Sequence, residues 1–290
     1  MTFHMPEILL ASWNENGCAV LKEMAKAGFP PRAVLLPSGF HFEQLRNLCF
    51  SFGVPTREIQ AGHRIVDGED ESITLIVSAS WPFRISPQDL CSSKFGGINV
   101  HSSFLPNYRG VHPLNCALIN DEPTIGVTVH EISEVMDGGD ILLQQRFPVT
   151  DDDDLLSVRE KAHSIGGHLV SSIVPEILAG RQKRLPQNED HVSFALRRFP
   201  SDGRIDWKLS ARKVFCFVRG NGRPGPGAFA CLGEKVLYIW KCKQIDSRDT
   251  GACPGTILSE DPLVISCGFE SAISALEFEG FKPMIGQVLE

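Results

Sequence analysis

The 290-residue sequence contains no long hydrophobic run. A membrane-spanning helix needs roughly 18 or more consecutive apolar residues, and no stretch of this chain approaches that length. The first residues, Met1 to Leu10, also lack the basic and long apolar segments of a secretory signal peptide. We therefore expect no membrane span and a cytoplasmic location.

Metal-ligand and disulfide spacings are also missing. The nine cysteines lie singly in mostly apolar segments, with no Cys-x-x-Cys spacing and no paired histidines beside them. Zinc sites and disulfide-rich frameworks depend on such spacings. We therefore predict no metal site and expect the cysteines to be small buried side chains.

The chain has no excess of positive charge. Its net charge is −7, and even the more basic part, residues 197–290, has only 13 Lys and Arg against 11 Asp and Glu. Proteins that bind nucleic acid usually present a strongly basic surface. The charge therefore argues against a nucleic-acid partner, although a local basic patch can exist in a net-acidic chain.

Two catalytic signatures are absent. The turn after the first apolar run, Trp13 to Gly17, has one glycine, whereas a dinucleotide-binding turn needs Gly-x-Gly-x-x-Gly so that the backbone can approach a pyrophosphate. No serine or cysteine lies in a nucleophile-elbow pattern. These absences argue against NAD or FAD binding and against a covalent acyl-enzyme.

What the chain does have is a regular alternation of short apolar runs and amphipathic segments. The runs predict buried, mostly parallel strands, and the segments between them predict helices. This pattern predicts a Rossmann-like α/β domain, in which ligands bind at the carboxyl ends of the strands. The expected strands cover residues 7–12, 33–36, 54–59, 73–80, 97–101, 124–132 and 141–149, and the expected helices end near residue 27 or cover 42–52, 112–120 and 155–179.

A change of composition predicts a second, smaller domain. Residues 180–198 are polar and without clear periodicity, and short strand-like runs with turn signals follow them. Such runs favour a small closed β-barrel. We expect a catalytic domain over residues 1–182, a linker over 183–200 and a second domain over 201–290.

Three polar residues are candidates for catalysis. Asn99 and His101 are two positions apart in one predicted strand, so their side chains share a face, and Asp137 lies in a Met-Asp-Gly-Gly-Asp turn. If the three converge, Asn99 can stabilise an oxygen that gains negative charge, His101 can donate to that oxygen or move a proton, and Asp137 can orient the imidazole. This set suits acyl transfer. Taken singly, His101 could be a core histidine and Asp137 an ordinary turn residue.

Several motifs, in this order, resemble the folate-dependent formyltransferase superfamily, which includes glycinamide ribonucleotide transformylase, methionyl-tRNA formyltransferase and the nucleotide-sugar N-formyltransferases. The motifs are GINVHSSFLPNYRG at 97–110, PLNCALIN at 113–120, GVTVH at 126–130 and MDGGDILLQ at 136–144. Two later segments, RRFPSDGRIDW at 197–207 and PGAF at 226–229, are similar to the start of the OB-like carboxyl-terminal domain of the longer members. The resemblance covers nearly the whole chain.

The resemblance implies a catalytic trio of Asn99, His101 and Asp137, and 10-formyltetrahydrofolate as the formyl donor. It implies that a neutral primary amine attacks the formyl carbon while Asn99 and His101 hold the oxyanion. His101 and Asp137 would then assist proton transfer from the amine to a folate nitrogen. The residues implied to hold the folate are Phe83, Arg84, Ile85, Ser86, Ser133, Glu134, Val135, Met136 and Asp140.

The acceptor follows less directly. Residues 105–110 and 113–115 are most similar to bacterial enzymes that formylate nucleotide-linked amino sugars, and the basic tRNA-binding loop of methionyl-tRNA formyltransferases has no counterpart at 37–47. The resemblance therefore favours a small amine, first an amino sugar and second a hydroxylated amino acid. The candidate acceptor contacts are Trp13, Asn14, Ser103, Tyr108 and Arg109, the first two standing where many relatives have small residues.

Other functions stay open at this point. Residues 219–221 and 226–229 also resemble the folate-hydrolase-like domain of formyltetrahydrofolate dehydrogenase, so water could be the acceptor. Methionyl-tRNA as acceptor and a folate-binding module without catalysis are further alternatives. The sequence leaves the oligomeric state undecided, a homodimer being one option.

Overall fold

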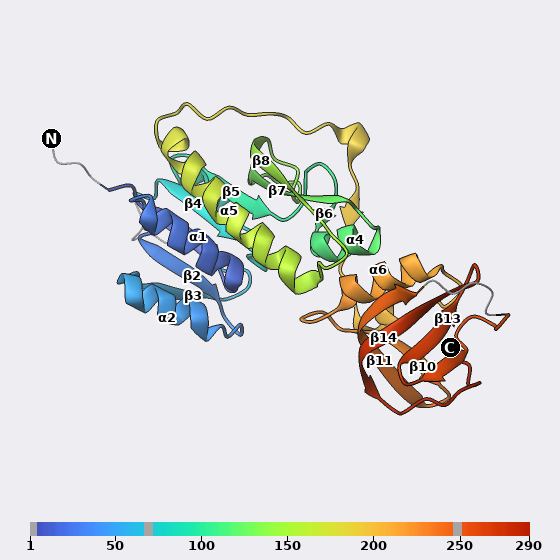
Figure 1. The fold of residues 1–290 in the computed structure, drawn as a ribbon. Helices are drawn as coiled ribbons and strands as arrows, with labels where there is room; N and C mark the ends of the chain where they lie inside the picture. The colour runs from blue at the N-terminus through green and yellow to red at the C-terminus, as the bar shows by residue number, and fades with distance from the viewer. Residues whose placement is uncertain (1–4, 67–71, 246–250) are drawn as a thin grey trace. The chain divides into compact units, whose positions relative to one another are not determined.

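The computed structural model of the protein describes residues 5–66, 72–245 and 251–290. The chain forms two compact units, which Figure 1 shows as ribbons. The first unit takes its residues from Met1–Gly110, Gly126–Phe147 and Glu160–Phe194, and the second from Val111–Ile125, Pro148–Arg159 and Ala195–Glu290. The domain borders expected at residues 182 and 201 stay a prediction.

A seven-stranded sheet runs through the first unit. Its strands are β1 (Ile8–Ser12), β2 (Ala33–Pro37), β3 (Thr56–Ile59), β4 (Leu75–Ala79), β5 (Gly97–His101), β7 (Thr124–Glu131) and β8 (Ile141–Pro148), in the order β3-β2-β1-β4-β5-β7-β8. The first five pair in parallel, and β5 pairs with β7 antiparallel. All residues of β1, β2 and β4 are buried, as expected for parallel strands covered on both faces. This confirms the predicted Rossmann-like α/β fold.

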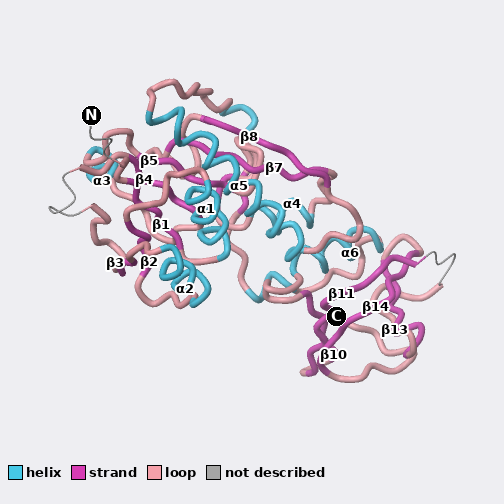
Figure 2. The backbone as a smooth tube through the Cα atoms, turned by 60° about the vertical axis from the view of Figure 1, so that its left-hand side comes forward, coloured by secondary structure: helices cyan, strands magenta, loops and turns pink. Residues whose placement is uncertain are grey.

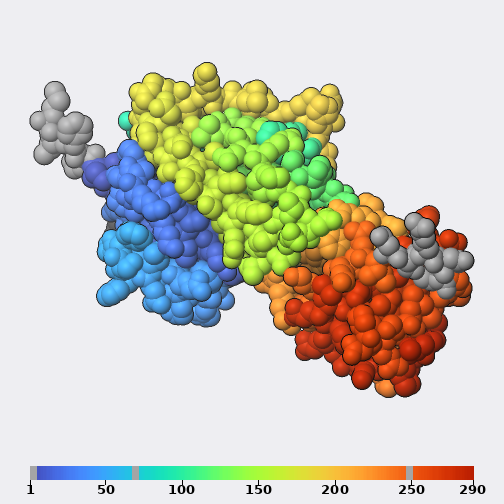
Figure 3. Space-filling model, viewed as in Figure 1, coloured from blue at the N-terminus to red at the C-terminus, as the bar shows by residue number. Residues whose placement is uncertain are grey.

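Two helices lie side by side along one face of this sheet, α1 (Glu15–Lys26) and α5 (Leu155–Leu178), as Figures 1 and 2 show. Gly167 of α5 allows the close approach to α1, and Gly166 allows the close approach of α5 to β5. A Cβ at Gly167 would lie 2.8 Å from the carbonyl oxygen of Ala19, and one at Gly166 would lie 2.7 Å from a methyl group of Val100. In the space-filling view the two helices form one continuous surface (Figure 3).

The remaining helices of the chain are α2 (Glu43–Phe52), α3 (Pro87–Cys91), α4 (Pro113–Ile119) and α6 (Ala211–Asn221), with short 3-10 helices at Glu189–His191 and Pro200–Gly203. Leu90 of α3 packs against a buried cluster that includes Leu9, Leu35 and Ile76. Helix α5 begins after Asp154, whose carboxylate accepts a hydrogen bond from the Ser157 N–H at 2.9 Å. The acidic residues at 151–154 therefore include a side chain that caps the start of α5.

The second unit contains a five-stranded antiparallel sheet and α6. The strands are β10 (Ala228–Leu232), β11 (Lys235–Ile245), β12 (Ile257–Glu260), β13 (Leu263–Cys267) and β14 (Ser271–Gly280), in the order β10-β11-β14-β13-β12. Buried side chains of α6, such as Val214 and Phe215, pack in one core with the strands. The predicted second β-domain is confirmed.

Some expectations differ from the structure. Helix α3 and the two-residue strands β6 (Arg109–Gly110) and β9 (Phe194–Ala195), which pair with each other, were not expected. All nine cysteines are free thiols, but Cys91 and Cys253 are exposed, so the prediction that every cysteine is buried was wrong. Within the described residues, no helix combines the length and the apolar composition that a membrane span requires.

Candidate active site

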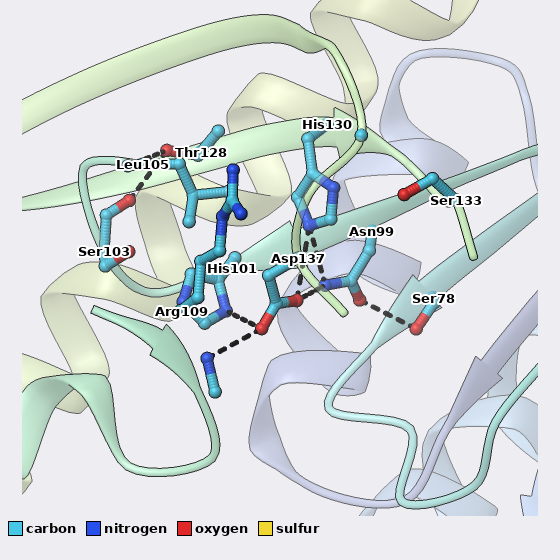
Figure 4. Close-up of polar contacts among 12 residues, drawn as sticks. Ser78, Asn99, His101, Ser103, Leu105, Arg109, Thr128, His130, Ser133 and Asp137 are labelled. Carbon is cyan, nitrogen blue, oxygen red and sulfur yellow. Dashed lines mark hydrogen bonds and ion pairs between the residues drawn. The ribbon is translucent and has the colours of Figure 1, made fainter. Parts of the chain in front are cut away.

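Three polar side chains lie in a row across the centre of the sheet. Asn99 on β5 is paired in register with Ser78 on β4 and with His130 on β7. Directly paired residues of neighbouring strands point to the same face. The register alone therefore brings Ser78, Asn99 and His130 together, as Figure 4 shows.

Hydrogen bonds fix the orientation of the Asn99 amide. The hydroxyl of Ser78 donates to Asn99 Oδ1 at 2.8 Å. His130 Nδ1 lies 2.8 Å from the carbonyl oxygen of Glu131, which can only accept, so this nitrogen carries the proton. In the neutral ring His130 Nε2 then accepts from Asn99 Nδ2 at 3.2 Å. The amino group of Asn99 also lies 3.5 Å from Asp137 Oδ1.

Asp137 lies in the loop between β7 and β8, and its backbone has a left-handed φ of +52°. Its Oδ2 accepts a hydrogen bond from the Gly110 N–H at 2.9 Å. A Cβ at Gly139 would lie 1.9 Å from the carbonyl oxygen of Glu131, so only glycine allows the loop to lie this close to β7. Asp137 is thus held beside the row of polar residues.

Electrostatics keep the Asp137 carboxyl ionised. Burial by itself raises the pKa of Asp137, but the nearby imidazoles of His101 and His130 and the hydrogen bond from the Gly110 N–H together lower the pKa to about 2. The Asp137 carboxyl group is therefore ionised at neutral pH.

His101, two residues after Asn99 on β5, is 6% exposed. Its Nε2 donates to the carbonyl oxygen of Tyr108 at 2.8 Å, and its Nδ1 lies 3.6 Å from Asp137 Oδ2 (Figure 4). Burial lowers the pKa of His101, an effect that Asp137 and the Tyr108 carbonyl oppose and that His130 reinforces. At neutral pH His101 is therefore a neutral ring whose unprotonated nitrogen faces a carboxylate.

The arrangement combines a hydrogen-bond donor with a base. The two N–H groups of Asn99 Nδ2 are directed at His130 Nε2 and, over a longer distance, at Asp137 Oδ1. A fixed donor of this kind in a partly buried site stabilises developing negative charge more strongly than a donor in water. A proton that reaches Nδ1 of His101 is stabilised by the Asp137 carboxylate. Both ring nitrogens of His101 already face protein atoms, so the ring must turn before it can donate to an external oxygen. An arrangement of this kind is able to polarise a bound carbonyl group through Asn99 and to accept a proton at His101 beside Asp137.

The first loop predicted to hold a ligand follows β4. The Phe83 ring lies between those of Phe40 and Trp81, with ring centroids 6.1 and 5.4 Å away. Ile85 is buried in the core, and the Ser86 side chain caps α3 by accepting from the Asp89 N–H. Phe83 is thus the aromatic, partly exposed member of this loop.

The second predicted loop precedes Asp137. Arg84 Nη2 donates to the carbonyl oxygen of Glu134 at 3.0 Å and so connects the two loops. The Ser133 hydroxyl donates to the Val135 carbonyl oxygen, and Val135 and Met136 are 61% and 69% exposed. Asp140 lies past Asp137, where its carbonyl oxygen accepts from the Glu131 N–H. The two loops together present exposed apolar side chains beside Asp137.

The residues predicted to contact an acceptor have partners inside the protein. Asn14 caps α1 by accepting from the Asn16 N–H, and the Trp13 ring packs edge-on against Phe40 at 5.0 Å. The Ser103 hydroxyl donates to the Asn107 carbonyl oxygen at 2.6 Å. That they bind an acceptor stays a prediction.

Tyr108 and Arg109 are the other two residues of that prediction. Tyr108 has a left-handed φ of +59° and directs its carbonyl oxygen at His101. Arg109 is only 3% exposed, and its guanidinium donates to the side chains of Gln187 and Glu189. Arg109 thus supports neighbouring segments of the protein.

Sequence reasoning missed four residues that contact the predicted trio: Ser78, Gly110, His130 and Gln187. A signal was present for two of them, since Ser78 and His130 are polar residues in otherwise apolar strands. No local pattern marks Gln187 or the Gly110 amide. Across the described part of the chain, no three His, Cys, Asp or Glu side chains gather as a metal site would need.

Comparisons with known proteins identify the family of the chain. Residues 58–174 match the family described as formyl transferase, and residues 199–289 match the formyl transferase carboxyl-terminal domain. The fold is similar to WlaRD, a sugar 3N-formyl transferase, with a TM-score of 0.69, 18% identity, and coverage of 97% of this chain and 100% of that chain.

Two further solved structures share the fold. An N-formyltransferase from Helicobacter canadensis has a TM-score of 0.72 and 19% identity, and the match covers 96% of this chain and 100% of that chain. HypX from Aquifex aeolicus has a TM-score of 0.64 and 18% identity over 96% of this chain and 45% of that chain. The two family matches together span more than two thirds of the residues, and the first of them includes Asn99, His101 and Asp137. The chain therefore belongs to the formyl transferase family.

Proposed function

We propose that this chain is an N-formyltransferase that moves the formyl group of 10-formyltetrahydrofolate to a primary amine of a small molecule. One observation carries the proposal: Asn99, His101 and Asp137 converge at the centre of the sheet, where His101 is buried and the other two are half-buried. In the reaction, the bond from the formyl carbon to the folate nitrogen breaks and a bond from that carbon to the amine forms. One proton passes from the amine to the folate nitrogen.

Each residue has a part that its contacts support. Asn99 stabilises the carbonyl oxygen as the amine attacks, because Ser78 and His130 hold its amino group in a single orientation. The His101–Asp137 pair accepts the proton that the amine loses, because neutral His101 has an unprotonated nitrogen beside an ionised carboxylate. The same pair returns that proton to the leaving nitrogen.

The residues near the trio fit a folate. The donor carries a flat heterocycle, and Phe83, Val135 and Met136 are accessible apolar side chains on two loops that Arg84 connects. WlaRD is described with 5-N-formyl-THF and dTDP, and the Helicobacter canadensis enzyme with folinic acid and dTDP-3-aminofucose.

These two proteins also support the acceptor class. We place a nucleotide-linked amino sugar first among acceptors, with a hydroxylated amino acid second, and expect a cytoplasmic enzyme. Whether it works as a homodimer is measurable by analytical ultracentrifugation of the purified chain.

An acceptor screen tests the proposal. The purified chain is incubated with 10-formyltetrahydrofolate and a panel of dTDP- and UDP-linked amino sugars, hydroxylated amino acids and methionyl-tRNA, and formylated products are identified by mass spectrometry. We expect one amino sugar to be formylated and His101→Ala to lose the activity by at least roughly 100-fold. Release of formate without any amine, at the rate of donor consumption seen with amine, would instead identify a hydrolase. Full activity of His101→Ala would refute the assignment of His101 as the base.

A further inference from the structure

The backbone of Asp137 needs an external support. A left-handed φ of +52° is unfavourable for a residue with a side chain, and two flexible glycines follow. The Gly110 N–H fixes only the carboxylate end of the residue. Whatever holds the main chain of this turn therefore decides where the carboxylate points.

The support comes from residues 184–193, which we call the return segment. This segment follows α5 and lies in the stretch expected to be a linker (yellow in Figure 1). Leu185 exchanges two backbone hydrogen bonds with Ile141, at 2.8 and 2.9 Å, and Arg184 is ion-paired with Glu131 at 2.6 Å. The return segment is thus attached to both strands that flank the Asp137 loop.

Gln187 of the return segment holds the turn directly. Its Nε2 donates to the carbonyl oxygen of Asp137 at 2.7 Å and to that of Gly139 at 2.8 Å. Both hydrogens of one amide group are therefore used on the two carbonyls that flank Gly138. This bidentate contact holds the main chain of the turn at Asp137 and at Gly139.

Arg109 fixes the amide of Gln187 in turn. Gln187 Oε1 accepts from Arg109 Nε at 3.1 Å and from Nη2 at 2.8 Å, so this end of the amide must be the oxygen and the other end must donate. The buried guanidinium is completed by Glu189, whose two carboxylate oxygens accept at 2.7 and 3.2 Å. Glu189, Arg109 and Gln187 thus form one connected chain of hydrogen bonds that ends at the Asp137 turn.

Residues 108–110, which include strand β6, also contact His101 and the Asp137 carboxylate. Tyr108 accepts from His101 through its carbonyl, and Gly110 donates to the Asp137 carboxylate through its N–H. Between them, Arg109 contacts Gln187 through its side chain and Ser193 through its N–H at 2.8 Å. Three consecutive residues therefore set His101, the Asp137 turn and the Asp137 carboxylate relative to one another.

We propose that Gln187, oriented by Arg109 and Glu189, is a positioning residue that holds Asp137 against His101. The inference rests on the proposed formyl transfer, in which this pair accepts the amine proton. Gln187 contacts only main-chain atoms of the turn, and its effect on catalysis passes through Asp137.

The test compares two variants of similar shape with one control. Gln187→Met removes both donors and the acceptor, and Gln187→Glu keeps the acceptor for Arg109 but removes both donors. Arg184→Met is the control, because it removes a different contact of the same return segment, that with Glu131. We expect both Gln187 variants to lower kcat by roughly 10- to 100-fold, the effect of a misplaced catalytic group, with KM for the donor within about threefold. Arg184→Met should retain kcat within about threefold.

A second measurement does not depend on activity. The pKa of His101 is followed by NMR titration of the imidazole signals in the wild-type chain and the three variants. The titratable groups that face His101 are Asp137, which raises its pKa, and His130, which lowers it. If Asp137 moves away in the Gln187 variants, the pKa of His101 falls further, whereas loss of stability alone leaves it unchanged in the folded protein.

The outcomes separate the two proposals. A lowered His101 pKa in both Gln187 variants, but not in Arg184→Met, supports the positioning role even if no amine in the screen is formylated. An unchanged His101 pKa together with wild-type kcat in Gln187→Met overturns it, whatever the acceptor is. If Gln187→Met does not fold, Gln187→Glu, which retains the contact with Arg109, decides by the same two measurements.

Discussion

The base role that we propose for His101 follows from the positions of its two ring nitrogens. One donates to the Tyr108 carbonyl, and the other faces an ionised carboxylate at 3.6 Å. Burial makes the charged ring unfavourable, while Asp137 reduces that penalty. The balance keeps the ring neutral at physiological pH and still able to take up a proton.

The pH dependence of the reaction follows from this balance. Because the pKa of His101 lies below its ordinary value of about 6.5, the inactive protonated ring forms only at lower pH. We expect kcat/KM for the donor to be constant from about pH 7 to 8 and to fall about tenfold per pH unit below the His101 pKa. Rate measurements from pH 5 to 9, with circular dichroism to verify folding, check this; an acid limb centred above pH 7 would contradict the assignment.

At the scale of elements, three neighbouring strands hold the Asn99 amide, which we propose stabilises the oxyanion. The register of β4, β5 and β7 aligns Ser78, Asn99 and His130, and a shift of one strand by one residue would turn its polar side chain to the opposite face. The central strands thus act as a rigid frame for one amide group.

Ser78→Ala tests this frame. The change removes the donor to Asn99 Oδ1, so the amide keeps only the contacts of its amino group with His130 and Asp137 and is less firmly oriented. We expect kcat to fall roughly tenfold, which corresponds to about 1.4 kcal/mol of transition-state stabilisation, with KM for the donor little changed.

Ser171→Ala is the matched control for this change. Its hydroxyl also donates to a carbonyl oxygen, that of His168, but on the exposed side of α5. Steady-state kinetics and thermal unfolding of both variants give the comparison. Equal kcat in Ser78→Ala and Ser171→Ala would show that the Asn99 orientation does not depend on Ser78.

At the scale of the whole molecule, the Asp137 carboxylate also affects folding. The pKa of Asp137 is about 2 in the folded chain and close to 3.8 when exposed, so ionised Asp137 favours the folded state. This contribution is fully present above about pH 4 and is lost as the pH falls from about 4 to 2. Its size is on the order of 2 kcal/mol.

Asp137→Asn should therefore reduce stability at pH 7 and have little effect near pH 2. Urea unfolding of the wild-type chain and the variant at a series of pH values measures the difference, followed in the transition of the unit that contains the site. The gap between the two proteins should narrow as the pH falls through 4 to 2. A gap that is constant over this range would mean that the carboxylate charge does not stabilise the fold.

Local pattern predicts much of the first unit. The predicted strand at 97–101 coincides with β5, and the turn at 136–140 lies where the apolar runs on either side require it. Strand periodicity also puts Asn99 and His101 on one face. Short elements whose formation depends on tertiary pairing, β6 and β9, have only two residues each and leave no periodic signal.

The sequence by itself determined the alternating α/β pattern, the candidate residues Asn99, His101 and Asp137, and the resemblance to the family. Each of these features depends only on residues that lie close together in the sequence. Only the tertiary structure decided how these residues are held. Strand register selected Ser78 and His130, and the return segment brought Gln187 to the main chain of Asp137, 50 residues away in sequence. Such contacts depend on where distant segments meet in space, and neither composition nor periodicity records that.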